Sequence, residues 1–105
     1  MKLVSLRSAA FLTACLISSS VAANEIEKSV SQSDDFKKHR TAFVTAATRL
    51  IERGTCTVAD FEEVGGFLKS MNHKNKPVYF TYCGGMTIAN RLYLNVSTGL
   101  VGVDP

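Results

Sequence analysis

The sequence has few of the nitrogen and sulfur side chains that bind zinc ions. It contains two histidines, His39 and His73, and three cysteines in 105 residues. A structural or catalytic zinc site needs three or four such ligands at workable spacing. No such grouping occurs here, because the histidines stand apart and two of the cysteines are expected to pair with each other. We therefore expect no metal ion and no cofactor.

The sequence also lacks an apolar run long enough to cross a membrane. Its main apolar stretch, 8–17, has about ten residues, whereas a spanning helix needs roughly twenty. Lys2 and Arg7 precede this stretch, and small residues follow it in Val21-Ala22-Ala23. This three-part layout is typical of a secretory signal peptide. We expect residues 1–23 to be a cleaved signal, and the mature protein to be periplasmic or secreted with no transmembrane span.

A second processing site is conceivable within the same segment. Leu12-Thr13-Ala14-Cys15 resembles the lipobox of bacterial lipoproteins, in which the cysteine becomes the acylated first residue. Only a short apolar stretch precedes Cys15, and Leu16-Ile17 continue the apolar run beyond it. We therefore favour cleavage near Ala23, with a lipid-anchored envelope accessory protein as an alternative. Both routes take the protein out of the cytoplasm.

The chain has only a small excess of positive charge. It contains 12 Lys and Arg against 9 Asp and Glu, a formal net charge of +3 at pH 7. Removal of Lys2 and Arg7 with the signal lowers this value to +1. A nucleic-acid-binding protein would carry a dense basic stripe. We therefore exclude nucleic acid as a partner.

The mature chain is long enough for one small domain. About 82 residues follow the signal, which allows one modest core. Two cysteines remain, Cys56 and Cys83, and an isolated pair in an oxidising compartment is typically bridged. The bridge would close a loop of about 28 residues and contribute roughly 3.5 kcal/mol of stability. We predict a Cys56–Cys83 disulfide.

A rival interpretation makes Cys83 a nucleophile. The glycine amides of Cys83-Gly84-Gly85 would stabilise an oxyanion, and His39 or His73 would supply the base. Neither histidine lies in a recognisable motif, so we favour the disulfide. A small cysteine-dependent enzyme or thiol-redox protein that uses Cys83 with His73 is the alternative function.

Apolar periodicity predicts one helix over 34–53. Its apolar residues recur at three- and four-residue spacing. Ser33 would accept the first free amides of this helix and Gly54 would end it. The preceding residues 24–33 are polar and weakly patterned, so we expect a flexible leader.

A second helix is predicted over 58–70, where Thr57 and Asp60 match a capping box. Gly65-Gly66 would fall in the middle of this helix, where each glycine costs about 1 kcal/mol relative to alanine. We attribute the pair to the close approach of another element. A hinge or a ligand against bare backbone is the functional alternative.

The period changes to two after Pro77, which indicates strands. Alternating segments occur at 78–83, 91–96 and 100–103, with turn residues between them. We therefore predict an α+β fold, in which two N-terminal helices pack on one face of a three-stranded antiparallel sheet with one disulfide. Residues 34–105 would form this single small domain.

Two surfaces are candidates for binding a partner. A sheet with helices on one face leaves its other face open, and tyrosines there suit protein recognition. Tyr79 and Tyr93 are our candidates for that face. The loop after the second helix would offer positive charge to an anionic partner, through Lys69, His73, Lys74 and Lys76.

These features favour a non-catalytic binding module exported from a bacterial cell. Such a module would be an inhibitor, an immunity factor or an accessory subunit of an envelope complex. Its partner would be another envelope protein or an anionic envelope component.

Overall fold

The protein has an α+β fold with one antiparallel sheet, as the sequence predicts. The computed structural model describes residues 21–73 and 75–104. The described elements are α2 (Ala23–Ser29), α3 (Phe36–Glu52), α4 (Val58–Val64), β1 (Leu68–Lys69), η1 (Met71–His73), β2 (Val78–Tyr82), η2 (Ile88–Asn90), β3 (Arg91–Asn95) and β4 (Val101–Gly102), of which η1 and η2 are 3-10 turns.

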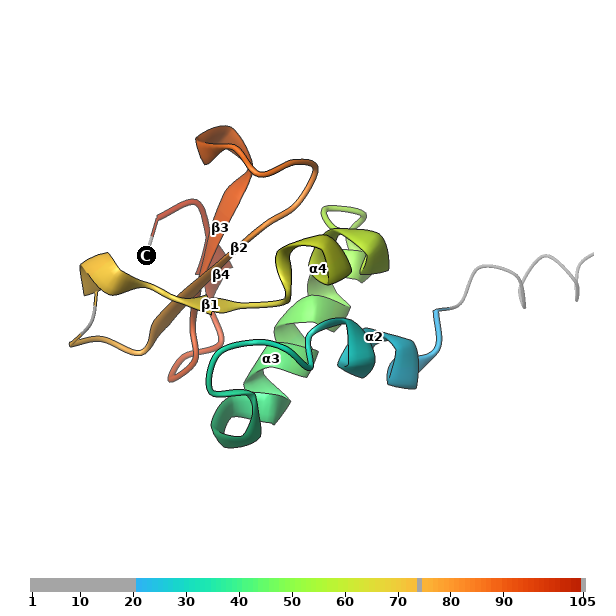
Figure 1. The fold of residues 1–105 in the computed structure, drawn as a ribbon, viewed down its shortest axis with the longest axis horizontal. Coiled ribbons are helices and arrows are strands. Elements are labelled where there is room, and N and C mark those ends of the chain that lie inside the picture. The colour runs from blue at the N-terminus through green and yellow to red at the C-terminus, as the bar shows by residue number, and fades with distance from the viewer. Residues whose placement is uncertain (1–20, 74, 105) are drawn as a thin grey trace, which may run out of the picture.

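The four strands lie in chain order and every neighbouring pair is antiparallel. The three helices of the described residues, α2, α3 and α4, gather on one side of this sheet (Figure 1). The sheet therefore has one strand more, and the helical layer one helix more, than the sequence predicted. Residues 1–20, with Cys15 and most of the expected signal, lie outside the described residues. Within the described residues no helix has the length and apolarity to span a membrane.

Residues 24–33 contain a helix that packs into the core, contrary to the expectation of a flexible leader. Ile26 and Val30 of this segment are 4% and 0% exposed and belong to the hydrophobic core. An ion pair between Glu27 and Arg40 also joins α2 to α3. Two apolar residues four positions apart give one narrow buried stripe, which is too short a pattern to separate from a polar leader.

The bounds of α3 match the predicted helix 34–53 to within two residues. Its buried face carries Phe43, Ala46, Ala47 and Leu50 at three- and four-residue spacing. The cap differs from the prediction, because Asp35 precedes the helix with a positive φ of 56° and makes no side-chain cap bond. The Ser33 hydroxyl instead accepts the N–H of Phe67 at 2.8 Å.

The second helix ends at Val64, six residues earlier than predicted. Gly65 and Gly66 both have positive φ, 92° and 90°, and two successive residues of this kind cannot continue a right-handed helix. The chain then turns back through Phe67, whose ring stacks on that of Phe43 with the ring centres 5.2 Å apart. Leu68 and Lys69 form β1 instead of a last helical turn, and pair with β2.

Gly66 marks a close approach between two segments, which confirms the prediction for this glycine but not for Gly65, where a Cβ would meet nothing within 4 Å. A Cβ at this position would lie 3.1 Å from the Val30 Cα and closer still to the Ser33 Oγ. The Ser33 hydroxyl donates to the Val30 carbonyl oxygen at 2.6 Å, so this side chain is held in place. The segment after α2 therefore rests directly on the backbone at Gly66.

We expect Gly66→Ala to destabilise the protein far more than Gly65→Ala. Both variants carry the cost of a left-handed alanine, about 1–2 kcal/mol. Only Gly66→Ala adds a clash, because no atom lies within 4 Å of a Cβ at Gly65. Urea unfolding should give Gly66→Ala a further loss of about 1–3 kcal/mol. Equal losses for the two variants would contradict the close approach.

Candidate functional site

A disulfide joins the helical layer to the sheet, as the sequence predicted. Cys56 lies before α4 and Cys83 follows β2, with their Cα atoms 5.1 Å apart. The two residues are 2% and 7% exposed. The rival interpretation loses its nucleophile here, because the Cys83 sulfur is bonded to that of Cys56.

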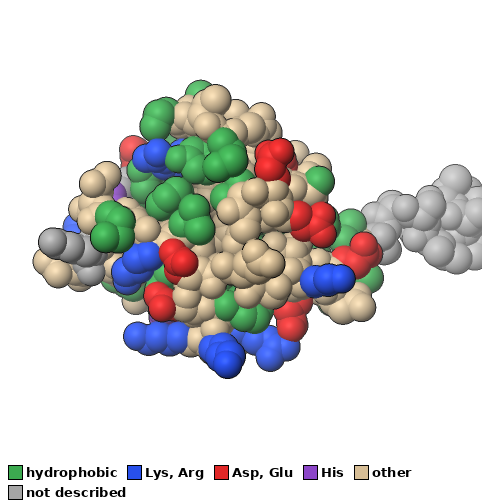
Figure 2. Space-filling view, in the orientation of Figure 1, with side chains coloured by type: hydrophobic (Ala, Val, Ile, Leu, Met, Phe, Trp, Pro, Cys, Tyr) green, Lys and Arg blue, Asp and Glu red, His purple; other side chains and the backbone are tan. Residues whose placement is uncertain are grey.

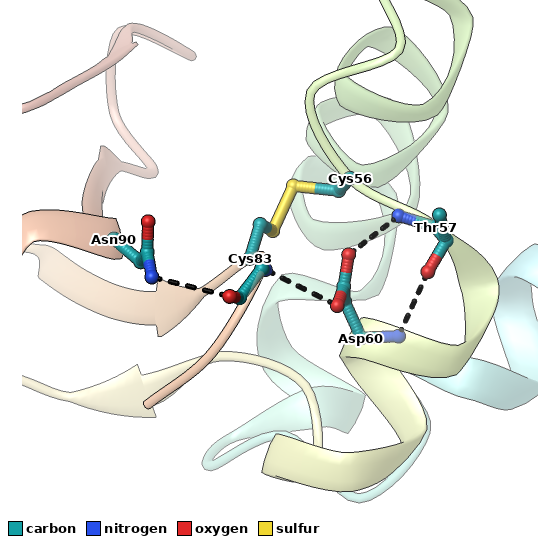
Figure 3. The surroundings of a disulfide bond; sticks show 6 residues. Cys56, Thr57, Asp60, Cys83 and Asn90 are labelled. Carbon is teal, nitrogen blue, oxygen red and sulfur yellow. Dashed lines mark hydrogen bonds between the residues drawn. A yellow bond between two sulfur atoms is a disulfide. The ribbon is translucent and has the colours of Figure 1, made fainter. Parts of the chain in front are cut away.

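Asp60 adds a polar connection beside the disulfide (Figure 3). Its carboxylate accepts the N–H of Thr57 at 2.9 Å and the N–H of Gly84 at 3.2 Å. The Asp60 N–H donates to the Thr57 hydroxyl at 3.1 Å, which completes the predicted capping box. The amide that the nucleophile interpretation assigned to an oxyanion thus binds a carboxylate of the protein itself.

The hydrogen bonds from the two backbone amides lower the pKa of Asp60. The bond from Thr57 has the largest effect and the bond from Gly84 adds to it, while partial burial of the carboxyl acts to raise the pKa. The loop beyond Gly84 is held in turn by Asn90, whose side-chain amide donates to the Gly84 carbonyl oxygen at 3.2 Å. The end of β2 is therefore fixed to α4 and the residues before it by the disulfide and by one hydrogen bond, from the Gly84 N–H to Asp60.

Tyr79 is not on the open face of the sheet, contrary to our expectation. It is 1% exposed and points towards the helices, where its hydroxyl donates to the Asp35 carboxylate at 2.6 Å. His39 and Phe43 contact its ring edge-on. Burial, and then the bond to Asp35, raise the pKa of Tyr79. This tyrosine serves the core and is not available to a partner.

The basic residues expected to form one patch are divided between the two sides of the sheet. Lys69 lies over the Tyr79 ring at 5.0 Å, on the helical side. His73 contacts the Tyr93 ring edge-on at 5.8 Å, and its Nδ1 is 2.8 Å from the Ser70 hydroxyl. Lys76 is exposed, and Lys74 lies outside the described residues. Lys69 and His73 therefore do not act together on one ligand.

Tyr93 does lie on the side of the sheet away from the helices, as expected. It pairs with Phe80, and the neighbouring pair Tyr82 and Arg91 lies next to them along the same two strands. Side chains alternate along a strand, so these four share one face, opposite to that of Tyr79. We call Phe80, Tyr82, Arg91 and Tyr93 the outer-face cluster.

Arg91 organises this cluster. Its Nε and Nη2 donate to the Tyr82 hydroxyl at 3.0 and 2.6 Å, and its Nη1 donates to the Tyr93 hydroxyl at 3.2 Å. The guanidinium also lies 5.3 Å from the ring centres of Phe80 and Tyr82. The bonds to Tyr93 and Tyr82 raise the pKa of Arg91. All four side chains are half-buried, so they are ordered and still reachable from solvent.

Phe80, Tyr82 and Arg91 were not among the residues predicted from the sequence to form a binding surface. Large or β-branched side chains occupy both parities of β2, so the pattern of this strand does not indicate which of its faces is open. The one sequence feature that could have indicated this site is Arg91, the first residue of an alternating segment rich in large side chains.

A shallow groove of about 220 Å³ continues from Tyr93 along β4, lined by Asn95, Thr98, Leu100, Val101, Gly102 and Asp104.

Comparison with protein-family models, with curated proteins and with solved structures found no match. Among the described residues no three His, Cys, Asp or Glu side chains lie close enough to hold a metal ion. The outer-face cluster is therefore the strongest candidate site.

We expect the double variant Cys56→Ser/Cys83→Ser to lose about 3.5 kcal/mol of unfolding free energy, because its unfolded chain is no longer closed by the loop. Urea unfolding measures this loss. Thiol titration of the untreated protein is the companion test, and should find no reactive Cys56 or Cys83 thiol until a reductant is added. Reactive thiols at these positions in the untreated protein would contradict the bridge.

We expect Asp60 to make stability depend on pH. A carboxyl whose pKa is lower in the folded than in the unfolded protein stabilises the fold at pH values above its unfolded pKa, about 3.9. This stabilisation is lost as the pH falls through the folded pKa. The stability difference between the native protein and Asp60→Asn should therefore be largest near pH 7 and shrink in acid.

Glu63→Gln is the matched control for this comparison. It removes one charge from the same helix, and the Glu63 side chain accepts neither of the hydrogen bonds that the Thr57 and Gly84 amides donate to Asp60. Unfolding by urea at a series of pH values measures both variants. A difference between the native protein and Asp60→Asn that is the same at every pH would contradict the role of the carboxylate.

Proposed function

We propose that this protein is an exported, non-catalytic binding module that recognises another envelope protein through its outer-face cluster. The observation that carries the proposal is the composition of that cluster, three aromatic rings around one arginine. Tyrosine and arginine are among the residue types that dominate binding energy in protein interfaces. An aromatic ring with a polar group suits a surface that is exposed to water in the free protein and buried in a complex.

The support behind the cluster is rigid. The opposite face of β2 and β3 carries Tyr79, Thr81 and Leu94, all 1% exposed or less. The cluster itself is held by three hydrogen bonds from Arg91. Side chains that are already fixed lose little entropy when a partner binds. This favours recognition by a preformed surface.

Exposed apolar side chains occur in the segments that flank the strands. Met71, Ile88, Leu100 and Val103 are each more than 70% exposed. In the view of Figure 2, hydrophobic groups lie over the sheet. A partner that contacts these segments would bury their apolar surface.

Export is part of the proposal. The N-terminal layout supports a secretory signal, and a buried disulfide suits an oxidising compartment. An inhibitor, an immunity factor or an accessory subunit of an envelope complex would each need a stable surface of this kind.

Cross-linking from defined positions tests the proposal. A photoreactive amino acid replaces Leu100, beside the groove, or Thr45, which is exposed on α3. In the envelope of its own cell, the protein should cross-link to a specific partner from position 100 and not from position 45.

Tyr93→Ala should reduce that product about 30-fold, the effect of losing one hot-spot side chain. Thr41→Ala on α3 is the control. A product that forms from position 45 alone, or that is indifferent to Tyr93→Ala, would refute binding through this face.

A further inference from the structure

The outer-face cluster presents hydrogen-bond donors without acceptors of its own. A guanidinium has five N–H donors, and Arg91 makes three hydrogen bonds, all to tyrosine hydroxyls. One N–H on Nη1 and one on Nη2 are left over. The hydroxyls of Tyr82 and Tyr93 accept from Arg91 and keep their own protons to donate.

The described part of the chain does not supply the missing acceptor. Within it, neither the Tyr82 nor the Tyr93 hydroxyl donates a hydrogen bond to another residue. The one ion pair among those residues is Arg40 with Glu27, so no carboxylate there pairs with Arg91. A positive charge beside two aromatic rings, with up to four unused donors, favours the binding of an anion.

The charge of the site favours a carboxylate over a phosphate. The cluster contains one guanidinium, which matches the single charge and the planar fork of a carboxylate. A phosphate monoester carries nearly two negative charges at pH 7 and is typically held by several cations. Lys69 of β1 lies on the other side of the sheet, over Tyr79. His73 contacts the Tyr93 ring edge-on, with its Nδ1 at the Ser70 hydroxyl.

The donors also distinguish between kinds of protein carboxylate. A chain terminus is commonly captured by a nest of backbone amides. Every free donor described above belongs to a side chain on a pleated face. This arrangement favours an acidic side chain that stands out from a folded surface.

We propose that the outer-face cluster binds an aspartate or glutamate side chain of the partner protein, held by Arg91 and the hydroxyls of Tyr82 and Tyr93. This inference rests on the proposed function, since it names the chemistry of the partner at the same site. The rings of Phe80, Tyr82 and Tyr93 would pack against the apolar groups around that carboxylate.

The test compares two peptides that differ in one group. Acetyl-Phe-Glu-amide and acetyl-Phe-Gln-amide are titrated to millimolar concentration into the ¹⁵N-labelled mature protein and followed by NMR. The glutamate peptide should shift the Arg91 Nε–H and the amides of Tyr82 and Tyr93, with an affinity at least about tenfold above that of the glutamine peptide. Acetyl-Phe-phosphoserine-amide, the third probe, should bind more weakly than the glutamate peptide.

Variants assign the preference to the cluster. Arg91→Gln should abolish the difference between the two peptides, and Lys76→Gln, which removes an exposed charge from the loop before β2, should preserve it. If Arg91→Gln fails to fold, the variant Tyr82→Phe/Tyr93→Phe keeps the rings, removes both hydroxyls and should lower the affinity for the glutamate peptide at least about threefold.

Several results would overturn the inference. They are equal affinity for the two peptides, no binding of the glutamate peptide, a preference that survives Arg91→Gln, and tighter binding of the phosphopeptide. If one of these occurs while cross-linking still depends on Tyr93, the binding role stands and the carboxylate assignment is wrong. If cross-linking also fails, the proposed function falls with it.

Discussion

The bond between Cys56 and Cys83 decides which face of the sheet is buried. Because Cys83 must reach the helical layer, the residues two and four positions before it, Thr81 and Tyr79, face the helices as well. The residues between them are turned outward. In the antiparallel register, Tyr93 and Arg91 of β3 pair with these outward residues, so they lie on the same outward face. The candidate site is thus a geometric consequence of a bridge on the opposite side of the sheet.

The helical layer depends on contacts between residues 30–35 and 66–69. Ser33 accepts the Phe67 N–H, the Asp34 N–H donates to the Phe67 carbonyl oxygen at 2.9 Å, and the Asp34 carboxylate accepts the Lys69 N–H at 2.8 Å. These bonds satisfy backbone groups that a short helix and a two-residue strand leave unpaired. They tie α2 to the start of the sheet, so the N-terminal helix and the outer-face cluster belong to one body.

The sequence predicts the parts of this fold that repeat a pattern. α3 was found to within two residues because four buried apolar side chains recur along it, and the disulfide because only one pair of cysteines remained. The face of β2 could not be read from 78–82, since large or β-branched side chains occupy both parities. The predicted disulfide held the answer, because a Cys83 that reaches α4 places Tyr79 inward. β1 and the early end of α4 depend on the positive φ at Gly65 and Gly66, which periodicity does not report.

The sheet ends on both sides in a strand of two residues, β1 and β4. Long, flat edge strands invite pairing with strands of other molecules, and natural proteins often keep such edges very short. Here each margin offers few backbone groups to an approaching strand. A protein that shows aromatic rings on a broad sheet is thereby protected against edge-to-edge aggregation, and its association with other molecules is left to side chains.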